Sequence, residues 1–108
     1  MPFYNLGDRE RKQLAPAVTL QTFWGARIHL SVVTIEPGGS VPRHSHEQEQ
    51  AGTVLEGEMV LGIGGEEKTV RPGDFYVVPR DVVHWVKPAK QRVVALDVFS
   101  PPREDYMY

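Results

Sequence analysis

Short apolar runs broken by glycine and proline are the feature that most constrains the fold of this chain. Glycine and proline together make up 19 of the 108 residues, clearly above the usual share of roughly 12%. The runs Val18–Phe23 and Ile28–Ile35 alternate between apolar and polar residues, which is the period of a β-strand. No stretch sustains the 3.6-residue period of a helix. The sequence therefore predicts many short strands joined by tight turns.

The segments between these runs carry the chemistry of specific turns. Gly64-Gly65 predicts a two-residue hairpin loop of type I′, because both central positions of that turn need positive φ. Arg71-Pro72-Gly73-Asp74 fits a type II turn, with proline at its second position and glycine at its third. Further strands are predicted at Thr53–Leu55, Met59–Ile63, Phe75–Val78, Val82–Val86 and Val93–Phe99.

So many short strands at close spacing indicate an all-β sandwich or barrel, formed by one domain that spans residues 1–108. Residues 1–13 are polar and weakly periodic, and they fit either an edge strand or an ordered arm.

Charge and composition exclude several classes of function. A formal net charge of -2 leaves no basic surface of the kind that binds nucleic acid. The absence of cysteine excludes disulfides and thiolate metal sites, and it fits a reducing compartment. Met1–Asp8 lacks a signal pattern, and no apolar run reaches membrane-spanning length. We expect a cytoplasmic protein that binds neither nucleic acid nor membrane.

Two histidines separated by a single residue, His44 and His46, stand on a strand-like stretch. Because side chains alternate between the faces of a strand, both imidazoles should point the same way. Such a pair is poorly suited to a core but suits a first-row divalent metal. Gln50 and His84 would add an amide oxygen and a third nitrogen. The sequence therefore predicts a metal site with four protein ligands.

The glycines and prolines around these residues resemble the two motifs of the cupin superfamily. The first motif is matched by Gly38-x5-His44-x-His46-x3-Gln50-x6-Gly57, with Gln50 where most members carry glutamate. The second is matched by Gly73-x5-Pro79-x-Asp81-x2-His84, with Asp81 in place of the usual glycine. The resemblance implies a double-stranded β-helix, or jelly-roll, barrel with His44, His46, Gln50 and His84 as metal ligands inside it. Since cupin barrels commonly dimerise, it also implies a homodimer.

Gln50 affects the charge of the expected metal centre. A glutamate would cancel one charge of a divalent ion, whereas a neutral amide cancels none. The metal should therefore be a stronger Lewis acid and a better host for an anionic ligand, although weaker metal retention is the competing expectation. Three histidines and a glutamine would accept zinc, nickel, iron, manganese or cobalt. The alternative is a cupin that has lost its metal and uses the histidines as hydrogen-bonding groups.

Asp97 is the one charged residue in the apolar run Val93–Phe99. It shares a strand face with Phe99, so both side chains could point into the barrel toward the metal. A carboxylate near a metal-bound substrate can serve as a general acid or base. A structural aspartate paired with an arginine or with backbone N–H groups is an equally good interpretation.

The last part of the chain suggests a substrate. The segment LDVFSPPREDY resembles the ending of a subfamily of small single-domain cupins associated with pectin degradation, and HSHEQEQ and VLEGE are also similar to that group. Those proteins open the ring of 4,5-unsaturated uronates to the linear keto form. The resemblance implies proton transfer by Asp97, a sugar pocket lined by Phe99, and a carboxylate bound by Arg103, whose planar fork suits that role. We expect a small anionic substrate, such as an unsaturated uronate.

Two other functions fit the same residues. Some cupins hold iron in a similar site and act as dioxygenases, but oxygen activation is helped by an anionic ligand, which Gln50 does not provide. A non-enzymatic module could bind a small carboxylate or sugar. Asp97 argues against that function, because a binder of anions gains nothing from a nearby carboxylate.

Three conspicuous side chains receive structural interpretations. His29 is isolated on its strand, opposite the face of Ile28, and is interpreted as a surface or packing histidine. Trp85 follows His84 and should point away from the ligands, as a packing or subunit-contact residue. Arg43 precedes His44 and should face outward by the same alternation, unless a bulge at the rim of the pocket redirects it.

Overall fold

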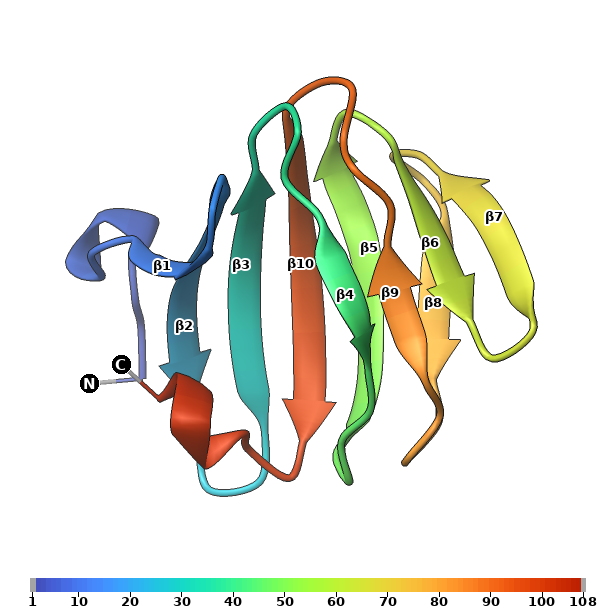
Figure 1. Cartoon of the computed structure of the whole chain (residues 1–108). Helices are drawn as coiled ribbons and strands as arrows, with labels where there is room; N and C mark the ends of the chain where they lie inside the picture. The colour runs from blue at the N-terminus through green and yellow to red at the C-terminus, as the bar shows by residue number, and fades with distance from the viewer. Residues whose placement is uncertain (1, 108) are drawn as a thin grey trace.

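This computed structural model describes residues 2–107. In this part of the chain, ten strands form two antiparallel sheets that face each other (Figure 1). The strand order is β1-β2-β3-β10-β5-β8 in the six-stranded sheet and β4-β9-β6-β7 in the four-stranded sheet. Two short 3-10 helices lie near the ends of the chain. The elements are η1 Leu6–Asp8, β1 Lys12–Ala15, β2 Val18–Trp24, β3 His29–Ile35, β4 Val41–His44, β5 Glu49–Glu56, β6 Met59–Ile63, β7 Glu66–Val70, β8 Phe75–Val78, β9 His84–Val86, β10 Val93–Ser100 and η2 Glu104–Tyr106.

This architecture confirms the predicted all-β jelly-roll fold. Each predicted strand overlaps an observed one, and residues 2–13 contain η1 and the start of the edge strand β1. Strand β1 partly realises the edge-strand alternative for residues 1–13, and β4 contains the strand-like stretch expected at His44, although it ends before His46. The range of β7 was not predicted, because Glu66–Val70 lacks a clear apolar alternation. No helix in the described part of the chain has the length and apolarity required to cross a membrane.

The turns show one confirmation and one correction. The Asp74 amide donates to the Arg71 carbonyl at 2.9 Å, and Gly73 has φ +99°, as a type II turn requires. The type I′ prediction for Gly64-Gly65 is wrong, because only Gly64 has a positive φ. The loop still has two residues, since Ile63 pairs directly with Glu66.

The apolar core lies between the sheets and occupies one end of the barrel, because inward-facing positions change from apolar to polar along several strands. On β10, Val93 and Ala95 are buried in the core, and the same face continues with Asp97 and Phe99. On β3 the inward face carries His29, whereas Ile28, just before the strand, is exposed. The polar end of the barrel is therefore where the predicted site residues gather.

Candidate metal centre

Three histidines converge at the polar end of the four-stranded sheet. His44 ends β4 and pairs across the strands with His84, the first residue of β9, with ring centroids 4.0 Å apart. His46 lies two residues beyond β4, so strand alternation does not account for its orientation, yet its ring centroid is 4.8 Å from that of His84. The potential ligand atoms of the three residues all lie within 4.8 Å of one another. The predicted grouping is present, although the turn after His44 produces it.

A backbone carbonyl holds each of these imidazoles through its Nδ1 atom. The Nδ1 of His44 lies 2.8 Å from the Pro42 oxygen, that of His46 lies 2.9 Å from the Gln48 oxygen, and that of His84 lies 2.9 Å from the Val82 oxygen. Because a carbonyl can only accept, Nδ1 carries the proton and Nε2 keeps its lone pair. Metal-binding histidines are usually held in this way.

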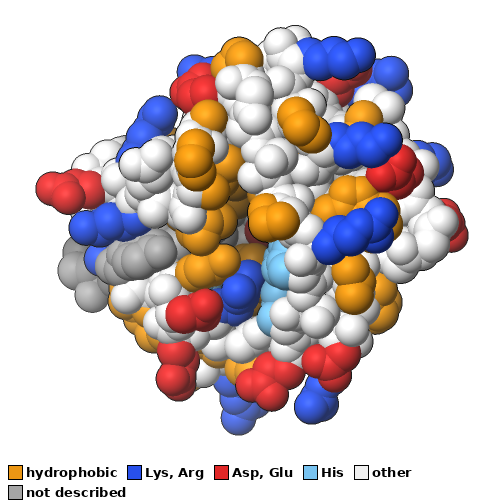
Figure 2. Space-filling view, in the orientation of Figure 1, with side chains coloured by type: hydrophobic (Ala, Val, Ile, Leu, Met, Phe, Trp, Pro, Cys, Tyr) orange, Lys and Arg blue, Asp and Glu red, His pale blue; other side chains and the backbone are white. Residues whose placement is uncertain are grey.

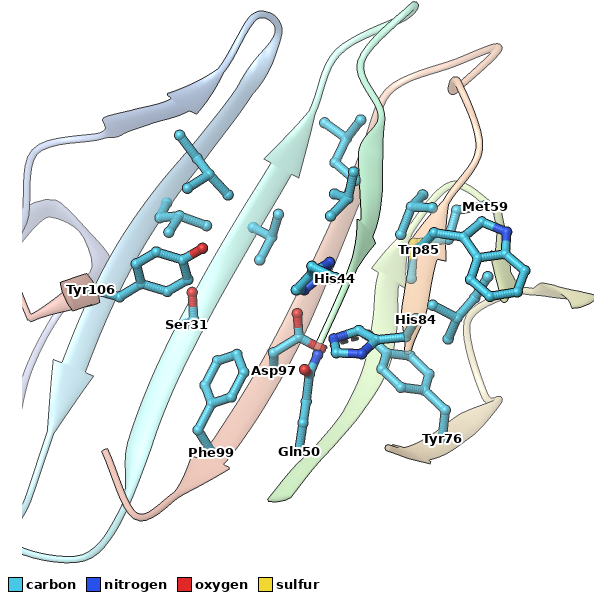
Figure 3. Close-up of a pocket in the computed structure, with 18 of the residues that line it drawn as sticks. Ser31, His44, Gln50, Met59, Tyr76, His84, Trp85, Asp97, Phe99 and Tyr106 are labelled. Atoms are coloured by element: carbon cyan, nitrogen blue, oxygen red, sulfur yellow. Dashed lines mark hydrogen bonds between the residues drawn. The ribbon is translucent and has the colours of Figure 1, made fainter. Parts of the chain in front are cut away.

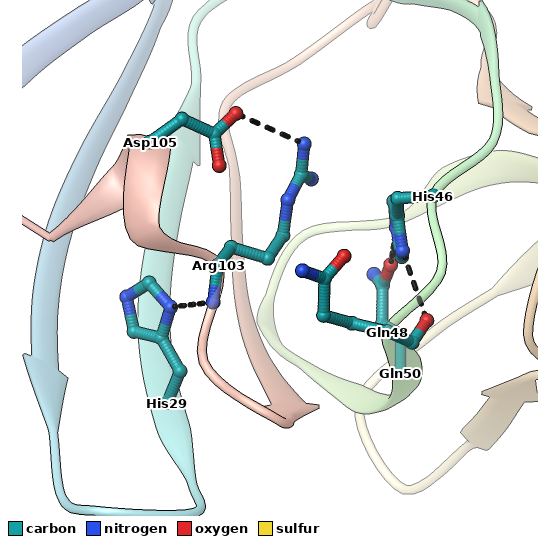
Figure 4. A network of polar contacts seen from close by, with 6 residues as sticks. All are labelled: His29, His46, Gln48, Gln50, Arg103 and Asp105. Atoms are coloured by element: carbon teal, nitrogen blue, oxygen red, sulfur yellow. Dashed lines mark hydrogen bonds and ion pairs between the residues drawn. The ribbon is translucent and has the colours of Figure 1, made fainter.

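Gln50 brings a fourth acceptor to the cluster. Its Oε1 lies 3.1 Å from His46 Nε2 (Figure 4), and its side chain also hydrogen-bonds to Asp97. The amide nitrogen must serve Asp97, because a carboxylate accepts, so an amide oxygen faces an imidazole lone pair. Two such acceptors repel unless a proton or a cation lies between them. Adjacent ligands with metal bonds of about 2.1 Å lie roughly 3.0–3.4 Å apart in octahedral to tetrahedral geometry, so the observed separation fits a shared ion.

His84 provides a further sign that a cation fits here. Its Nε2 is buried and has no hydrogen-bond partner among residues 2–107, which is uncommon for a buried polar atom. Burial lowers the pKa of His84 to about 4, and burial followed by the Arg103 charge lowers the pKa of His46. Both rings are therefore neutral near pH 7, the form that binds a metal.

Asp97 stands on the facing wall of the same cavity, in a row formed by three strands. It pairs with Gly52 on β5, and Gly52 pairs with Tyr76 on β8. The Tyr76 hydroxyl crosses over Gly52 and donates to Asp97 Oδ1 at 2.7 Å. A Cβ atom on Gly52 would collide with the Asp97 carboxylate and would lie 2.6 Å from the Tyr76 ring. This row therefore requires glycine at position 52.

The hydrogen-bond partners of Asp97 differ from those considered on sequence grounds. Tyr76 and Gln50 bond to it, rather than an arginine or backbone N–H groups. Burial raises the pKa of Asp97 to about 6, against the lowering effects of these two hydrogen bonds and of the Arg103 charge. A carboxylate with that pKa is well suited to exchange protons near neutral pH. Sequence reasoning missed Tyr76, because only the strand register brings it to Asp97.

Phe99 and Arg103 complete the wall near the opening. The buried Phe99 ring lies 5.5 Å from that of His46 and edge-on to it. The Arg103 guanidinium lies 5.4 Å from the Phe99 ring and 3.9 Å from the Tyr106 ring. The Arg103 side chain is only 11% exposed and forms a 3.6 Å ion pair with Asp105. A partly buried cation therefore stands beside the cluster, and Tyr106 is a neighbour that the sequence did not indicate.

Most of these side chains, together with apolar residues of the core, line a cavity of about 70 Å³ (Figure 3). A groove of about 300 Å³ shares His44, Arg103 and Tyr106 with it and runs to the surface past Leu14 on β1. In the space-filling view this opening is a hollow with histidine and a basic side chain at its rim (Figure 2). Of the seven predicted site residues, six line this cavity, and the seventh, His46, contacts His84, Gln50 and Phe99.

The neighbouring residues on the outer face have structural roles. Trp85 is buried, its indole N–H donates to Glu67 at 2.8 Å, and the Arg43 guanidinium lies over its ring at 3.6 Å. Arg43 thus faces outward as predicted, and Trp85 is a packing residue.

Comparison with known proteins identifies a family and a relative that match most of this chain. The family model described as "Cupin domain" matches residues 31–99. The pectin degradation protein KdgF of Dickeya dadantii (strain 3937) is 25% identical over 107 residues, covering 98% of this chain and 91% of that protein.

Two solved structures share the fold. An RmlC-like cupin from Shewanella frigidimarina NCIMB 400 is 24% identical, with a TM-score of 0.92 over 99% of this chain and 96% of that one. KdgF from Halomonas sp. is 23% identical, with a TM-score of 0.90 over 97% of this chain and 99% of that one.

Proposed function

This chain belongs to the cupin domain family, and on that premise we propose that it is a metal-dependent enzyme that opens the ring of a small unsaturated uronate. The proposed product is the linear keto form, and the reaction needs no redox change. The similarity to the pectin degradation protein KdgF over nearly the whole chain supports this substrate class.

The observation that carries the proposal is a group of hydrogen-bond acceptors in the cavity that face one another with no donor between them. Three imidazoles hold their Nε2 lone pairs toward one region, and Gln50 adds an amide oxygen 3.1 Å from one of them. A divalent transition-metal ion held by His44, His46, Gln50 and His84 would polarise sugar oxygens and stabilise negative charge that forms on them. Since none of these ligands is charged, the ion would also favour an anionic substrate.

The opposite wall carries groups that suit the rest of a uronate. Arg103 presents a partly buried guanidinium beside Phe99, and a planar fork of this kind binds a carboxylate through two hydrogen bonds. The Phe99 ring offers an apolar surface to the sugar ring. We therefore assign Phe99 and Arg103 to substrate binding and expect them to orient the sugar between the ligand cluster and Asp97.

Asp97 is the proposed general base. It would accept the proton of the anomeric hydroxyl while the bond between C1 and the ring oxygen breaks and a C1 carbonyl forms. The ring oxygen, attached to C5 of the C4–C5 double bond, then leaves as an enolate. Protonation at C4 converts this enolate to the C5 ketone, so the proton lost from the anomeric hydroxyl is balanced by the proton gained at C4. Tyr76 and Gln50 would keep the carboxylate oriented during the transfer.

The test compares metal-free and metal-loaded wild-type protein on 4,5-unsaturated galacturonate. Ring opening removes the conjugated double bond, so ultraviolet absorbance follows the reaction. We expect no turnover after chelation and full recovery after one of the five candidate metals is restored. A fully metal-loaded protein that leaves the substrate unchanged would contradict the proposal. Oxygen consumption by the iron-loaded protein would instead favour the dioxygenase function.

We also propose that the functional unit is a homodimer. The outer face of the six-stranded sheet exposes Phe75, which is 79% exposed, together with Val77 and Leu55. These residues lie on the neighbouring strands β8 and β5, and an apolar surface of this kind commonly marks an interface. Analytical ultracentrifugation should find a dimer that Phe75→Glu converts to a monomer and Val83→Glu does not. A monomeric wild-type protein would refute this proposal.

The predicted cytoplasmic location stays a prediction.

A further inference from the structure

His29 is the one histidine of the chain that lies outside the ligand cluster, and it is fully buried at 0% exposure. The surface alternative for this residue is therefore excluded. Its Nδ1 accepts a 3.0 Å hydrogen bond from the backbone N–H of Arg103 (Figure 4). Nδ1 must then be unprotonated, which is the opposite tautomer to that of the three clustered histidines. His29 thus holds the backbone of Arg103, whose guanidinium is the cation beside the ligand cluster.

The segment Pro101–Met107, here called the C-terminal arm, is attached to the barrel at a second buried point. The Thr22 hydroxyl on β2 donates to the Tyr106 carbonyl at 2.9 Å, and Thr22 is buried. His29 and Thr22 lie on the paired strands β3 and β2. The ends of chains usually fray unless they are tied down, and these two hydrogen bonds tie the arm on either side of Glu104 and Asp105.

The arm directs Arg103 into the site. The backbone N–H of Arg103 points to His29, whereas its guanidinium lies against the Phe99 and Tyr106 rings at the mouth of the cavity. Phe99 pairs with His29 on one side and with Gln50 on the other. The anchor of the arm, the expected sugar-binding ring and one expected metal ligand therefore lie in a single row across β3, β10 and β5.

We propose that His29 is a positioning residue, which fixes the C-terminal arm so that Arg103 meets the carboxylate of the substrate. The role rests on the proposed function, because it assumes an anionic sugar at Arg103. It differs from a packing role in one respect that can be measured. A packing side chain can be replaced by another of similar volume, whereas this role needs a hydrogen-bond acceptor at the position of Nδ1.

Two substitutions in the metal-loaded protein separate these roles. His29→Leu fills the space but removes the acceptor, whereas His29→Asn places an amide oxygen close to the position of Nδ1. Hydrogen exchange measured by NMR reports the Arg103 amide directly. We expect slow exchange in the wild type and in His29→Asn, and exchange at least roughly 10-fold faster in His29→Leu, because the hydrogen bond is lost.

Binding of two sugars reports the consequence for the site. D-galacturonate and D-galactose differ in the carboxylate, so the ratio of their dissociation constants measures the contribution of the charge. We expect His29→Leu to weaken galacturonate binding roughly 10- to 100-fold, the size of a hydrogen bond to a charged group, with galactose binding and metal content unchanged. In turnover the same variant should raise KM far more than it lowers kcat, and His29→Asn should restore most of the loss.

A matched control excludes a general loss of stability. Val70→Ala removes a buried side chain on β7, at the far side of the barrel from the arm (Figure 1). It should change neither the Arg103 exchange rate nor the ratio between the two sugars.

Three results would overturn the proposal. These are unchanged exchange of the Arg103 amide in His29→Leu, an unchanged sugar ratio despite faster exchange, and a wild type that does not prefer galacturonate to galactose. A wild type that binds galacturonate but does not open the unsaturated uronate contradicts the proposed function alone, and the His29→Leu comparison then still decides the role of His29.

Discussion

The two sheets contribute different chemistry to one cavity. The four-stranded sheet and the turn after β4 supply three imidazoles, each held by a carbonyl two residues away in the chain. The six-stranded sheet supplies Asp97, Phe99 and Gln50, and Asp97 is held by Tyr76 from two strands away. The wall formed by the three histidines, here called the histidine wall, is thus built from local contacts. The wall that carries Asp97, here called the carboxylate wall, is built from strand register.

This difference suggests that binding of the metal and movement of the proton can be separated by mutation. Substitutions in the histidine wall should remove the metal and everything that depends on it. Substitutions in the carboxylate wall, apart from those of Gln50, should leave the metal in place and lower turnover. Gln50 connects the two walls, because its amide oxygen faces His46 and its side chain hydrogen-bonds to Asp97.

The largest effect is expected from His84→Ala. This substitution removes a proposed ligand whose Nε2 is buried without a hydrogen-bond partner in the described structure, so metal affinity should fall by more than about 100-fold. Turnover should be abolished. Elemental analysis after gel filtration measures the metal, with Asp97→Asn as the matched control from the other wall. If His84→Ala still bound one metal ion per chain, the histidine wall would not be what holds the metal, and the separation of metal binding from proton transfer would be wrong.

A loss of turnover with full metal content is expected from Asp97→Asn. Removal of a general base costs roughly 10²- to 10⁴-fold in rate, and the metal ligands are untouched. In the wild type, turnover should fall as the pH decreases through the pKa of Asp97, because the protonated form cannot accept a proton. That pKa is about 6 without metal, and a nearby cation would lower it, so the acid limb should lie at pH 6 or below. Wild-type rates in Asp97→Asn would remove its assigned role.

A smaller effect on the same wall is expected from Gly52→Ala. The new Cβ would collide with Asp97 and press on the Tyr76 ring, so turnover should fall and the free energy of unfolding should decrease by about 1–3 kcal/mol. Gly65→Ala is the matched control, because a Cβ there meets no atom within 4 Å. Steady-state kinetics and urea denaturation measure both quantities. Equal turnover and equal stability of the two alanine variants would show that the close packing of Asp97, Gly52 and Tyr76 is not needed for activity or folding.

The smallest effect is expected on the outer side of the histidine wall. Arg43→Ala removes a guanidinium that lies over Trp85 at 3.6 Å, which should cost about 0.5–1 kcal/mol of stability at this exposed site. Metal content and turnover should not change, because Arg43 faces away from His44. A loss of metal, measured by elemental analysis, would show that the wall depends on its outer face.

The histidine wall could largely be predicted from the sequence, whereas the contacts of the carboxylate wall could not. His44, His46 and Gln50 lie within seven residues, and strand alternation correctly placed Asp97 and Phe99 on one inward face. The link from Tyr76 to Asp97 depends on the pairing of β8 with β5 and of β5 with β10. Residue spacing does not encode such register, so this partner was missed.

Similar reasons explain the other differences. Val41–His44 and Glu66–Val70 are polar or interrupted by proline, and pairing with neighbouring strands rather than their own pattern makes them strands. His29 looked isolated because its partner, Arg103, lies 74 residues away. Local patterns therefore indicated the fold and the side chains that gather at the site, and long-range pairing determined how the remaining side chains are held.

The central claim is that three imidazoles and one amide oxygen bind a single metal ion. X-ray absorption spectroscopy of the zinc-loaded protein, with the zinc content measured on the same sample, tests it most directly. We predict one ion per chain with three histidine nitrogens and a light oxygen ligand in its first shell, and loss of one imidazole contribution or of the ion itself in His84→Ala. Absence of bound zinc after gel filtration, or a first shell without imidazole, would contradict the claim.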